Sequence, residues 1–379
     1  MNISANARFL TQKVTGVQLY ARQLHSWAIS NLPGVRWYCP VSNRGGSSSS
    51  EIAKKVSVPV GPRGVSGHPW EQLILPRQVL GDVLFCPCNS APLLTPRRTP
   101  LIVTIHCLAF RAVPQAFTLK YRLWYSFMTE VLSRRATGII SVSKSEAHNI
   151  MSLYPKSRDS IDVIENGVVT ISEWNSLRDA RASRSERAMV VKKSKELQLL
   201  FVGAPTAKKN FDQAMIAVRK LQEMGYNCKL SVAGAIPSGM LSSGADRDGK
   251  TGISFLGQVD DRGAMLDLYK KSDVLLFPSR FESSGLPPLE ASAAGCVAIC
   301  SDLPALVERC GKGALYCRDG SGVETANLVN RLFQGSIPIN NILESAYSRV
   351  QDLFWEDCSR RTFSWIHERA QERKRLISK

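Results

Sequence analysis

Short apolar runs alternate with amphipathic stretches along most of the chain. Near-continuous apolar runs, unlike alternating ones, are typical of strands buried on both faces. Helical patterns between them occur at residues 211–225 and 262–272. This alternation predicts α/β architecture, with parallel sheets covered by helices on both faces. The predicted strands are residues 82–87, 101–106, 138–143, 162–166, 197–203, 228–234, 253–257, 273–279 and 296–302.

A charged segment interrupts this pattern. Residues 170–196 have few apolar positions and no sustained period, and they separate two sets of βα units. The chain has 379 residues, which is too many for one ordinary core. We therefore predict a doubly wound domain at 1–169, a linker at 170–196, a second doubly wound domain at 197–345, and a helical tail at 346–379 that packs back toward the first domain.

Basic residues are concentrated in the first half. Residues 1–169 hold 19 Lys and Arg against 8 Asp and Glu, and the remainder holds 30 against 24. This balance suggests an anionic partner (nucleic acid, a membrane surface or a phosphorylated substrate), and solubility alone is the alternative. The sequence lacks the aromatic-basic motifs of nucleic-acid-binding modules, so we expect no nucleic acid partner.

Residues 117–135 form an amphipathic stretch in which basic and aromatic residues are mixed. Its apolar residues at 117, 121, 124, 128 and 131 have a helical period. Two interpretations stand side by side at this point: a helix that rests on an anionic membrane, and a helix packed into its domain.

Location in the cell is indicated by three features of the sequence. No apolar run approaches the roughly 20 residues that span a bilayer, and the N-terminus lacks the apolar middle of a signal peptide. The ten cysteines contain no CxxC pair, which argues against a zinc site or a thioredoxin-like motif. We expect a cytoplasmic protein with reduced cysteines.

The stretch RFESSGLPPLEASAAG, residues 280–295, carries the main candidate chemistry. It follows a predicted strand, and in doubly wound sheets ligands bind outside the carboxyl ends of strands. Proline is well suited to the first helical positions, so a helix should begin near Pro287. The backbone N–H groups of Ser284, Gly285 and Leu286 would then form an anion site at the helix N-terminus.

Glu282 and Glu290 flank this predicted anion site. Two carboxylates beside a phosphate repel it unless they accept hydrogen bonds from hydroxyl groups, and sugars supply such donors. We interpret Glu290 as a ribose ligand and Glu282 as a ligand of the second sugar in a nucleotide-diphospho-sugar. The alternative is that Glu290 only favours the helix dipole and Glu282 is a solvated loop charge.

The same stretch resembles the Glu-x7-Glu signature of retaining glycosyltransferases of family 4, which have the GT-B fold, and in particular their mannosyltransferase-like branch. Further segments that resemble the family, in its order, are TGVQLYARQL (15–24), GHPWEQLILPR (67–77), FCPCNSAPL (85–93), VTIHCLAF (103–110), ISVSKSE (140–146), VIENGV (163–168), FVGAPTAKKN (201–210), VAGA (232–235) and FLGQV (255–259). The resemblance implies two Rossmann-like domains that face each other across a cleft, with the donor on the second.

The resemblance also implies roles for single residues on the donor side. The family places a diphosphate-binding basic residue at Lys209, and often a second at Lys208; two solvated lysines would be the alternative for the pair alone. The histidine at the position of His106 approaches the donor sugar. Gly16 and Gly203 complete the donor-side candidates, and we expect His106, Lys209 and Glu282 to be the catalytic residues.

Acceptor-side candidates and departures from the family pattern complete the set. Glu71, in HPWEQ, and Asn89 match the acceptor-side pattern. Cys107 stands where the family commonly has aspartate, and Ala204 where many relatives have arginine. The triplet 246–248 (Asp-Arg-Asp) is similar to the metal motif of the other large glycosyltransferase fold, but its loop setting favours a solvated turn. We expect no metal and no cofactor.

The resemblance therefore implies a retaining glycosyltransferase of cell-surface polysaccharide biosynthesis. Such an enzyme moves a hexose, mannose or similar, from a nucleotide-diphospho-sugar to a glycan or polyprenyl-diphosphate-linked acceptor. It would be cytoplasmic and peripheral on the inner face of the plasma membrane. A catalytically weakened nucleotide-sugar-binding subunit or scaffold is the alternative that Cys107 and Ala204 keep open.

Overall fold

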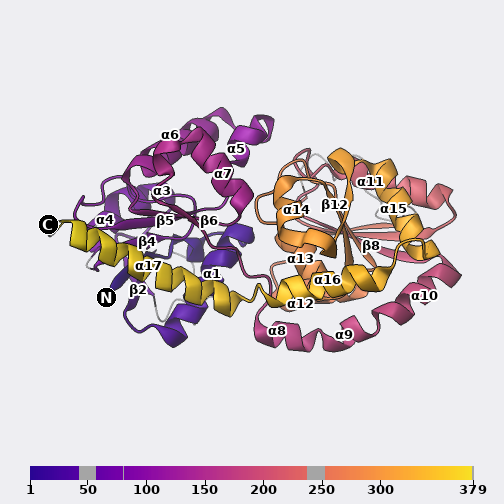
Figure 1. Ribbon diagram of the computed structural model, residues 1–379. Coiled ribbons are helices and arrows are strands. Elements are labelled where there is room, and N and C mark those ends of the chain that lie inside the picture. Colours follow the sequence, from indigo (N-terminus) through magenta and orange to yellow (C-terminus); the bar gives the residue numbers. More distant parts are fainter. Residues whose placement is uncertain (42–56, 80, 237–251, 378–379) are drawn as a thin grey trace. The chain divides into compact units, whose positions relative to one another are not determined.

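The computed structural model describes residues 1–41, 57–79, 81–236 and 252–377 (Figure 1). The chain forms two compact units. The first consists of Met1–Gly167 together with Trp355–Lys379, and the second of Val168–Phe354. Each unit is built on one parallel sheet flanked by helices, so the prediction of two doubly wound α/β domains is confirmed.

The sheet of the first unit has seven strands in the spatial order β3-β2-β1-β4-β5-β6-β7. The strand order reverses between β1 and β4, which makes the carboxyl ends of these two strands the topological switch point. The strands are β1 (Ile3–Asn6), β2 (Val35–Pro40), β3 (Val58–Val60), β4 (Val83–Cys86), β5 (Leu101–Ile105), β6 (Gly138–Ser141) and β7 (Ile161–Val163).

Helices cover both faces of this sheet. They are α1 (Gly16–Asn31), α3 (Gly67–Pro69), α4 (Leu75–Gln78), α5 (Ala109–Ala112), α6 (Leu119–Arg135), α7 (Lys144–Leu153) and α17 (Trp355–Ile377), with a π-helical segment η3 (Trp70–Ile74) and 3₁₀ turns η1 (Arg8–Thr11), η4 (Pro114–Ala116) and η5 (Pro155–Ser157).

The C-terminal helix α17 is part of the first unit. The ring of Phe363 lies edge-on to Trp37 and Phe85, with centroids 6.5 and 6.1 Å away. A Cβ on Gly138 of β6 would lie 2.5 Å from the Trp365 ring, so the glycine leaves the space that this ring fills. The portion of the tail that packs on the first unit begins at Trp355, because residues up to Phe354 belong to the second unit.

The second sheet has six strands in the order β10-β9-β8-β11-β12-β13, and its switch point lies between β8 and β11. Successive residues of β11 enter opposite cores: Val274 and Leu276 on one face, Leu275 and Phe277 on the other. The strands are β8 (Glu196–Val202), β9 (Asn227–Ala233), β10 (Ile253–Gly257), β11 (Val274–Phe277), β12 (Val297–Ser301) and β13 (Leu315–Cys317).

Helices also cover both faces of the second sheet. They are α8 (Ile171–Ser176), α9 (Arg178–Ala182), α10 (Arg184–Ser194), α11 (Phe211–Glu223), α12 (Arg262–Lys271), α13 (Leu286–Ala293), α14 (Pro304–Cys310), α15 (Gly322–Gln334) and α16 (Ile339–Gln351), with 3₁₀ turns η6 (Gly311–Gly313) and η7 (Arg318–Gly320).

The prediction of a linker at residues 170–196 is wrong. The segment forms α8, α9 and α10 inside the second unit. A capping box between Thr170 and Glu173 starts α8, and the fully buried Leu177 and Val191 anchor the segment in the two cores of this unit. Ion pairs of Arg184 and Arg187 with Asp273 add to these apolar anchors, so a segment without a sustained apolar period is still docked in the unit.

Candidate active site

The switch point of the second unit brings two sequence-predicted residues together. Lys209 follows β8 and Glu282 follows β11, and these strands are neighbours in the sheet. The Nζ atom of Lys209 lies 2.6 Å from Oε1 of Glu282 and 4.6 Å from the centroid of the Phe277 ring. Both side chains keep partial exposure, 19% for Lys209 and 13% for Glu282, so a ligand can reach the pair.

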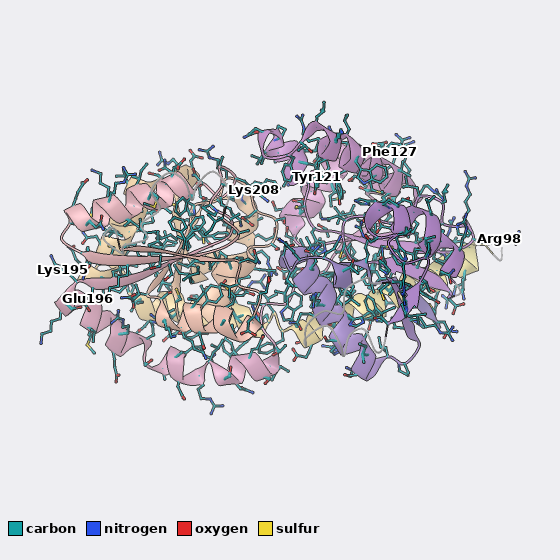
Figure 2. The ribbon with its side chains drawn as sticks, turned by 180° about the vertical axis from the view of Figure 1, so that it is seen from behind. Arg98, Tyr121, Phe127, Lys195, Glu196 and Lys208 are labelled. Carbon is teal, nitrogen blue, oxygen red and sulfur yellow. The ribbon has the colours of Figure 1, made fainter. Side chains whose placement is uncertain are left out.

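Gly203 makes room for the lysine. Its φ of +124° favours glycine, and a Cβ at this position would come within 3.0 Å of Cε of Lys209. Lys208 is half-buried, and its carbonyl accepts a hydrogen bond of 2.9 Å from the backbone N–H of Arg280. Its Nζ lies 5.8 Å from the centroid of the Phe281 ring (Figure 2). Both lysines are thus held at the carboxyl edge of the sheet.

Helix α13 begins at Leu286, one residue before the position that the sequence predicts. Its N-cap is Gly285, with a φ of +56°, and a Cβ there would lie 2.8 Å from Cδ2 of Leu306. Backbone conformation and packing thus require a glycine at this position, whether or not a ligand also approaches it. The Ser284 carbonyl accepts a hydrogen bond of 3.0 Å from Nε of the buried Arg309, which orients the loop. Pro287 and Pro288 have no backbone N–H, and the N–H of Leu289 donates to the Gly285 carbonyl at 3.4 Å, so the first turn itself offers a ligand the N–H of Leu286.

Glu290 lies one turn into α13 and is 6% exposed. One of its carboxylate oxygens pairs with the guanidinium of Arg262, and the other accepts a hydrogen bond of 2.9 Å from the Tyr269 hydroxyl. Arg262 also contacts Glu173 at 2.9 Å and the Val168 carbonyl at 2.9 Å. A carboxylate oxygen has two lone pairs, so Glu290 keeps capacity for a sugar hydroxyl beside these partners.

Arg262 and Tyr269 are the residues that sequence reasoning missed around Glu290. Burial by itself lowers the pKa of Arg262, but the charges and hydrogen bonds of Glu290 and Glu173 outweigh it and raise the pKa above the ordinary value. Both residues lie in a helix that the sequence predicts, at 262–272. Nothing in its pattern indicates that they reach a carboxylate on a helix further along the chain.

His106 and Asn89 lie in the first unit, at the carboxyl edge of its sheet. His106 is buried, its Nε2 lies 2.7 Å from the Pro87 carbonyl, and its backbone N–H donates to Oδ1 of Asn89 at 2.5 Å. The Tyr20 ring packs edge-on against it at 4.7 Å between centroids. Asn89 adopts a φ of +53°, which bends the loop so that its amide can reach His106.

Burial lowers the pKa of His106 to about 4, although the hydrogen bond to Pro87 raises it. The folded state therefore binds fewer protons than the unfolded state between pH 6.5 and about 4, so stability falls as the pH falls through this window. We expect His106→Gln to remove up to about 3 kcal/mol of this acid sensitivity. Urea unfolding of the wild type and of His106→Gln at pH 7, 5.5 and 4 measures this difference. An equal loss of stability in the two proteins as the pH falls would show that His106 is not its cause.

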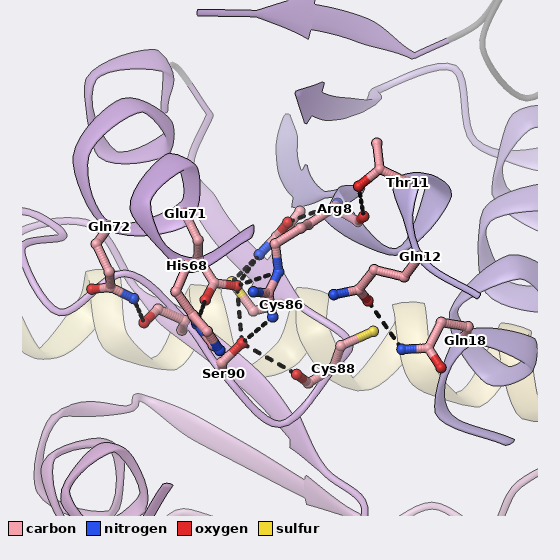
Figure 3. Close-up of polar contacts among 12 residues, drawn as sticks. Arg8, Thr11, Gln12, Gln18, His68, Glu71, Gln72, Cys86, Cys88 and Ser90 are labelled. Atoms are coloured by element: carbon pink, nitrogen blue, oxygen red, sulfur yellow. Dashed lines mark hydrogen bonds and ion pairs between the residues drawn. The ribbon is translucent and has the colours of Figure 1, made fainter. Parts of the chain in front are cut away.

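Glu71 lies at the switch point of the first unit, within the π-helical segment η3, and none of its surface is exposed. Figure 3 shows the polar side chains that converge on it. Its carboxylate accepts hydrogen bonds of 2.7 Å from Asn6, 3.0 Å from Ser90 and 3.2 Å from His68, and Nε of Arg8 lies 3.5 Å away.

This network keeps Glu71 ionised. Burial alone raises the pKa of its carboxyl group, but the hydrogen bonds from His68 and Ser90 and the charges of Arg8 and His68 bring the pKa below the ordinary value. Arg8, which is also buried, donates a hydrogen bond of 2.9 Å from its guanidinium to the Ser90 hydroxyl. Glu71 organises the edge of the sheet, and an acceptor could touch it only if the network opened.

The remaining candidates are placed as follows. Gly16 is the exposed first residue of α1. Gly16 and His106 belong to the first unit, and the other donor-side candidates to the second. The departures Cys107 and Ala204 are both half-buried. The Asp-Arg-Asp triplet at 246–248 lies outside the described residues.

Comparison with known families assigns both halves of the chain. Residues 16–171 match the family described as Glycosyltransferase Family 4, and residues 183–346 match Glycosyl transferases group 1. These two matches, together with the two doubly wound domains, place the chain in the class of GT-B glycosyltransferases. The chain belongs to the glycosyltransferases of the family 4 type.

Several relatives of modest similarity are named, among them mannosyltransferases and a glycogen synthase. The chain is 28% identical over 216 residues to the O-antigen chain mannosyltransferase RfbU of Salmonella typhimurium. The aligned region covers 56% of this chain and 55% of the relative. It is 29% identical over 163 residues to a GDP-mannose-dependent alpha-(1-6)-phosphatidylinositol dimannoside mannosyltransferase of Mycobacterium tuberculosis, covering 42% and 41%. The chain spans about half the length of the curated relatives it matches.

Solved structures agree on the fold. Anabaena HepE in complex with UDP and glucose superposes with a TM-score of 0.69 at 14% identity, over 97% of this chain and 99% of HepE. WaaG, a glycosyltransferase involved in lipopolysaccharide biosynthesis, superposes with a TM-score of 0.66 at 17% identity, over 96% of this chain and 99% of WaaG. Within the described part of this chain, no helix combines the length and the hydropathy that a membrane span requires.

Proposed function

We propose that this glycosyltransferase moves mannose or a similar hexose from a nucleotide-diphospho-sugar to a glycan or polyprenyl-diphosphate-linked acceptor of cell-surface polysaccharide biosynthesis, with retention of configuration. The observation that carries the proposal is the pair of Lys209 and Glu282 at the switch point of the second sheet. The names of the relatives, two of which are mannosyltransferases, support the choice of sugar. The setting would be the cytoplasmic face of the plasma membrane.

The proposed reaction uses the charges at this edge of the sheet. The bond between the sugar C1 and the β-phosphate oxygen breaks, and the acceptor oxygen forms a bond to C1 on the same face. Negative charge grows on the leaving diphosphate, where the Lys209 ammonium and the backbone N–H groups of Ser284, Gly285 and Leu286, at the start of α13, stabilise it. The acceptor hydroxyl passes its proton to the leaving phosphate, so no carboxylate base is needed.

Glu282 and Glu290 position the donor in this proposal. Glu282 accepts hydrogen bonds from the hydroxyl groups of the transferred sugar. It does so either beside its hydrogen bond from Lys209 or in place of that bond. Glu290 accepts a ribose hydroxyl beside Arg262 and Tyr269. Lys208 and Gly203 line the phosphates, and His106 and Gly16, in the first unit, keep the donor-side roles that the family resemblance implies. Lys209 supplies the positive charge, so we infer that transfer needs no metal and continues in the presence of EDTA.

We expect Glu290→Gln to raise the dissociation constant of the donor nucleotide by about tenfold or more, because a hydrogen bond to a charged acceptor is worth roughly 1.5–3 kcal/mol. Isothermal titration measures it. Tyr269→Phe is the matched control, since it removes a protein partner of the same carboxylate and should change donor affinity little. Equal affinity of Glu290→Gln and wild type would exclude the ribose role.

A thermal-shift panel of nucleotide-sugars, followed by transfer assays, tests the function as a whole. A ligand at 100 times its dissociation constant should add roughly 2.7 kcal/mol to the stability. We expect a nucleotide-hexose to stabilise the chain and to be consumed. Stabilisation without turnover would instead support a nucleotide-sugar-binding subunit, and no stabilisation by any nucleotide-sugar would refute the proposal.

A further inference from the structure

Helix α6 carries apolar side chains on two of its faces. On the inner face, Met128 and Leu132 are buried in the core of the first unit. On the outer face, Leu119, Leu123 and Phe127 are 63%, 62% and 54% exposed. Their spacing of four residues aligns them in one row, which we call the outer stripe.

Aromatic rings extend the outer stripe sideways. Tyr121, 39% exposed, stacks on Phe117 and Tyr125 with centroids 5.1 and 4.3 Å apart. Figure 2 shows Tyr121 and Phe127 on this helix. Single exposed apolar side chains are normal, but rows of them mark interaction sites. Among the described residues, no other helix exposes four large apolar side chains.

The charges around the stripe are mainly positive. Residues 107–129 contain Arg111, Lys120 and Arg122 and no aspartate or glutamate, and the carboxylate that follows, Glu130, is paired with Arg134. Arg111 and Arg122 border a shallow cavity of about 190 Å³, which Leu119 and Leu123 also line. This volume is below the about 300 Å³ at which ligand pockets begin. Two guanidinium groups beside an apolar hollow match a phosphate attached to an acyl chain.

The topology places the stripe near the candidate site of the first unit. The chain leaves β5 at Ile105 and passes through α5 before α6 begins at Leu119. The N-terminal end of α6 therefore lies toward the carboxyl edge of the sheet, where His106 and Asn89 are found. A surface held by the stripe would adjoin the edge at which an acceptor must arrive.

We propose that the outer stripe of α6, with Arg111, Lys120 and Arg122, docks the enzyme on a bilayer that contains anionic phospholipids. The apolar side chains enter the boundary between headgroups and acyl chains, and the three cations bind lipid phosphates. A second copy of the chain fits less well, because a two-fold interface would set these cations against themselves. The inference extends the lipid-linked acceptor of the proposed function.

Co-sedimentation of the full chain with vesicles tests the proposal. We expect binding to phosphatidylglycerol/phosphatidylcholine vesicles, weak binding to phosphatidylcholine alone, and a decline with rising salt. The double substitution Leu123→Ser/Phe127→Ser should lower the partition coefficient about tenfold or more. Arg111→Gln/Arg122→Gln should abolish the preference for the anionic lipid. The control is Met189→Ser/Val190→Ser on α10, where two exposed apolar side chains can be replaced without effect.

Outcomes against the proposal are equally defined. It is overturned if the wild type does not bind the anionic vesicles, or if the stripe variant binds as the wild type does. Light scattering that shows a dimer lost in the stripe variant, with no vesicle binding, would assign the stripe to self-association instead. Donor affinity, measured on the same variants, should not change. Vesicle binding without any donor binding would refute the proposed function and leave this inference standing.

Discussion

Replacing Lys209 by methionine is expected to lower the turnover number for sugar transfer by about 10²–10³-fold, which corresponds to roughly 2.7–4 kcal/mol for the loss of one electrostatic donor at a site of developing charge. The ammonium of Lys209 lies at the switch point of the second sheet, and the diphosphate gains charge only as the glycosidic bond breaks. The loss should therefore fall more on kcat than on KM for the donor.

Two neighbouring lysines serve as controls for this substitution. Lys208→Met removes a cation that lies close by but contacts the Phe281 ring, and we expect a smaller effect. Lys220→Met removes an exposed cation of α11 paired with Glu223, and transfer should continue at the wild-type rate. Steady-state kinetics with the best donor measures all three. A Lys209→Met enzyme of normal kcat would exclude Lys209 from the reaction.

Replacing Glu71 by alanine is expected to destabilise the protein by about 3–5 kcal/mol, because it leaves the buried Arg8 without its carboxylate partner. This is a large part of the about 5–15 kcal/mol that holds a typical domain together. Asn6 and Ser90 lose an acceptor at the same time. Urea unfolding at pH 7, monitored by fluorescence and by circular dichroism, gives the difference.

The matched control is Glu130→Ala in the same unit. Glu130 pairs with Arg134 on the surface of α6, with 41% of its side chain exposed, so its removal should cost less than about 0.5 kcal/mol. The pKa of Glu71 lies below its ordinary value, so its stabilisation is present at neutral pH and is lost as the carboxyl group takes a proton in acid. Equal stabilities of Glu71→Ala and Glu130→Ala would contradict the role given to the network.

The sequence predicts best those features that are local in the chain. About twenty residues hold the strand, Glu282 and the helix of residues 286–293. The end of the strand and Pro287 fix where the loop and the helix lie, so this part of the site follows from the local sequence. The core strands are likewise predictable, because their apolar runs are continuous. Strand β1 is not, because Ser4 and Asn6 interrupt its four residues even though all four are buried.

Long-range contacts account for what the sequence does not predict. Glu290 is held by Arg262 and Tyr269, and Glu71 by Asn6 and Arg8, from elements that spacing cannot bring together. Helix α6 shows a second limit. Its predicted apolar positions do include residues packed in the core, but positions 119, 123 and 127 have the same helical spacing and are exposed. A helical period of apolar residues shows that they share one face of the helix, but it does not show whether the rest of the protein buries that face.

The central claim is that a nucleoside diphosphate binds where β8 and β11 part, between Lys209 and the first turn of α13. A crystal structure with the donor nucleotide tests this most directly. We predict the β-phosphate within hydrogen-bonding distance of the Lys209 Nζ atom and of the backbone N–H groups of Ser284, Gly285 and Leu286, with the ribose beside Glu290. A nucleotide bound elsewhere on the second unit, with Lys209 still paired to Glu282, would contradict the account.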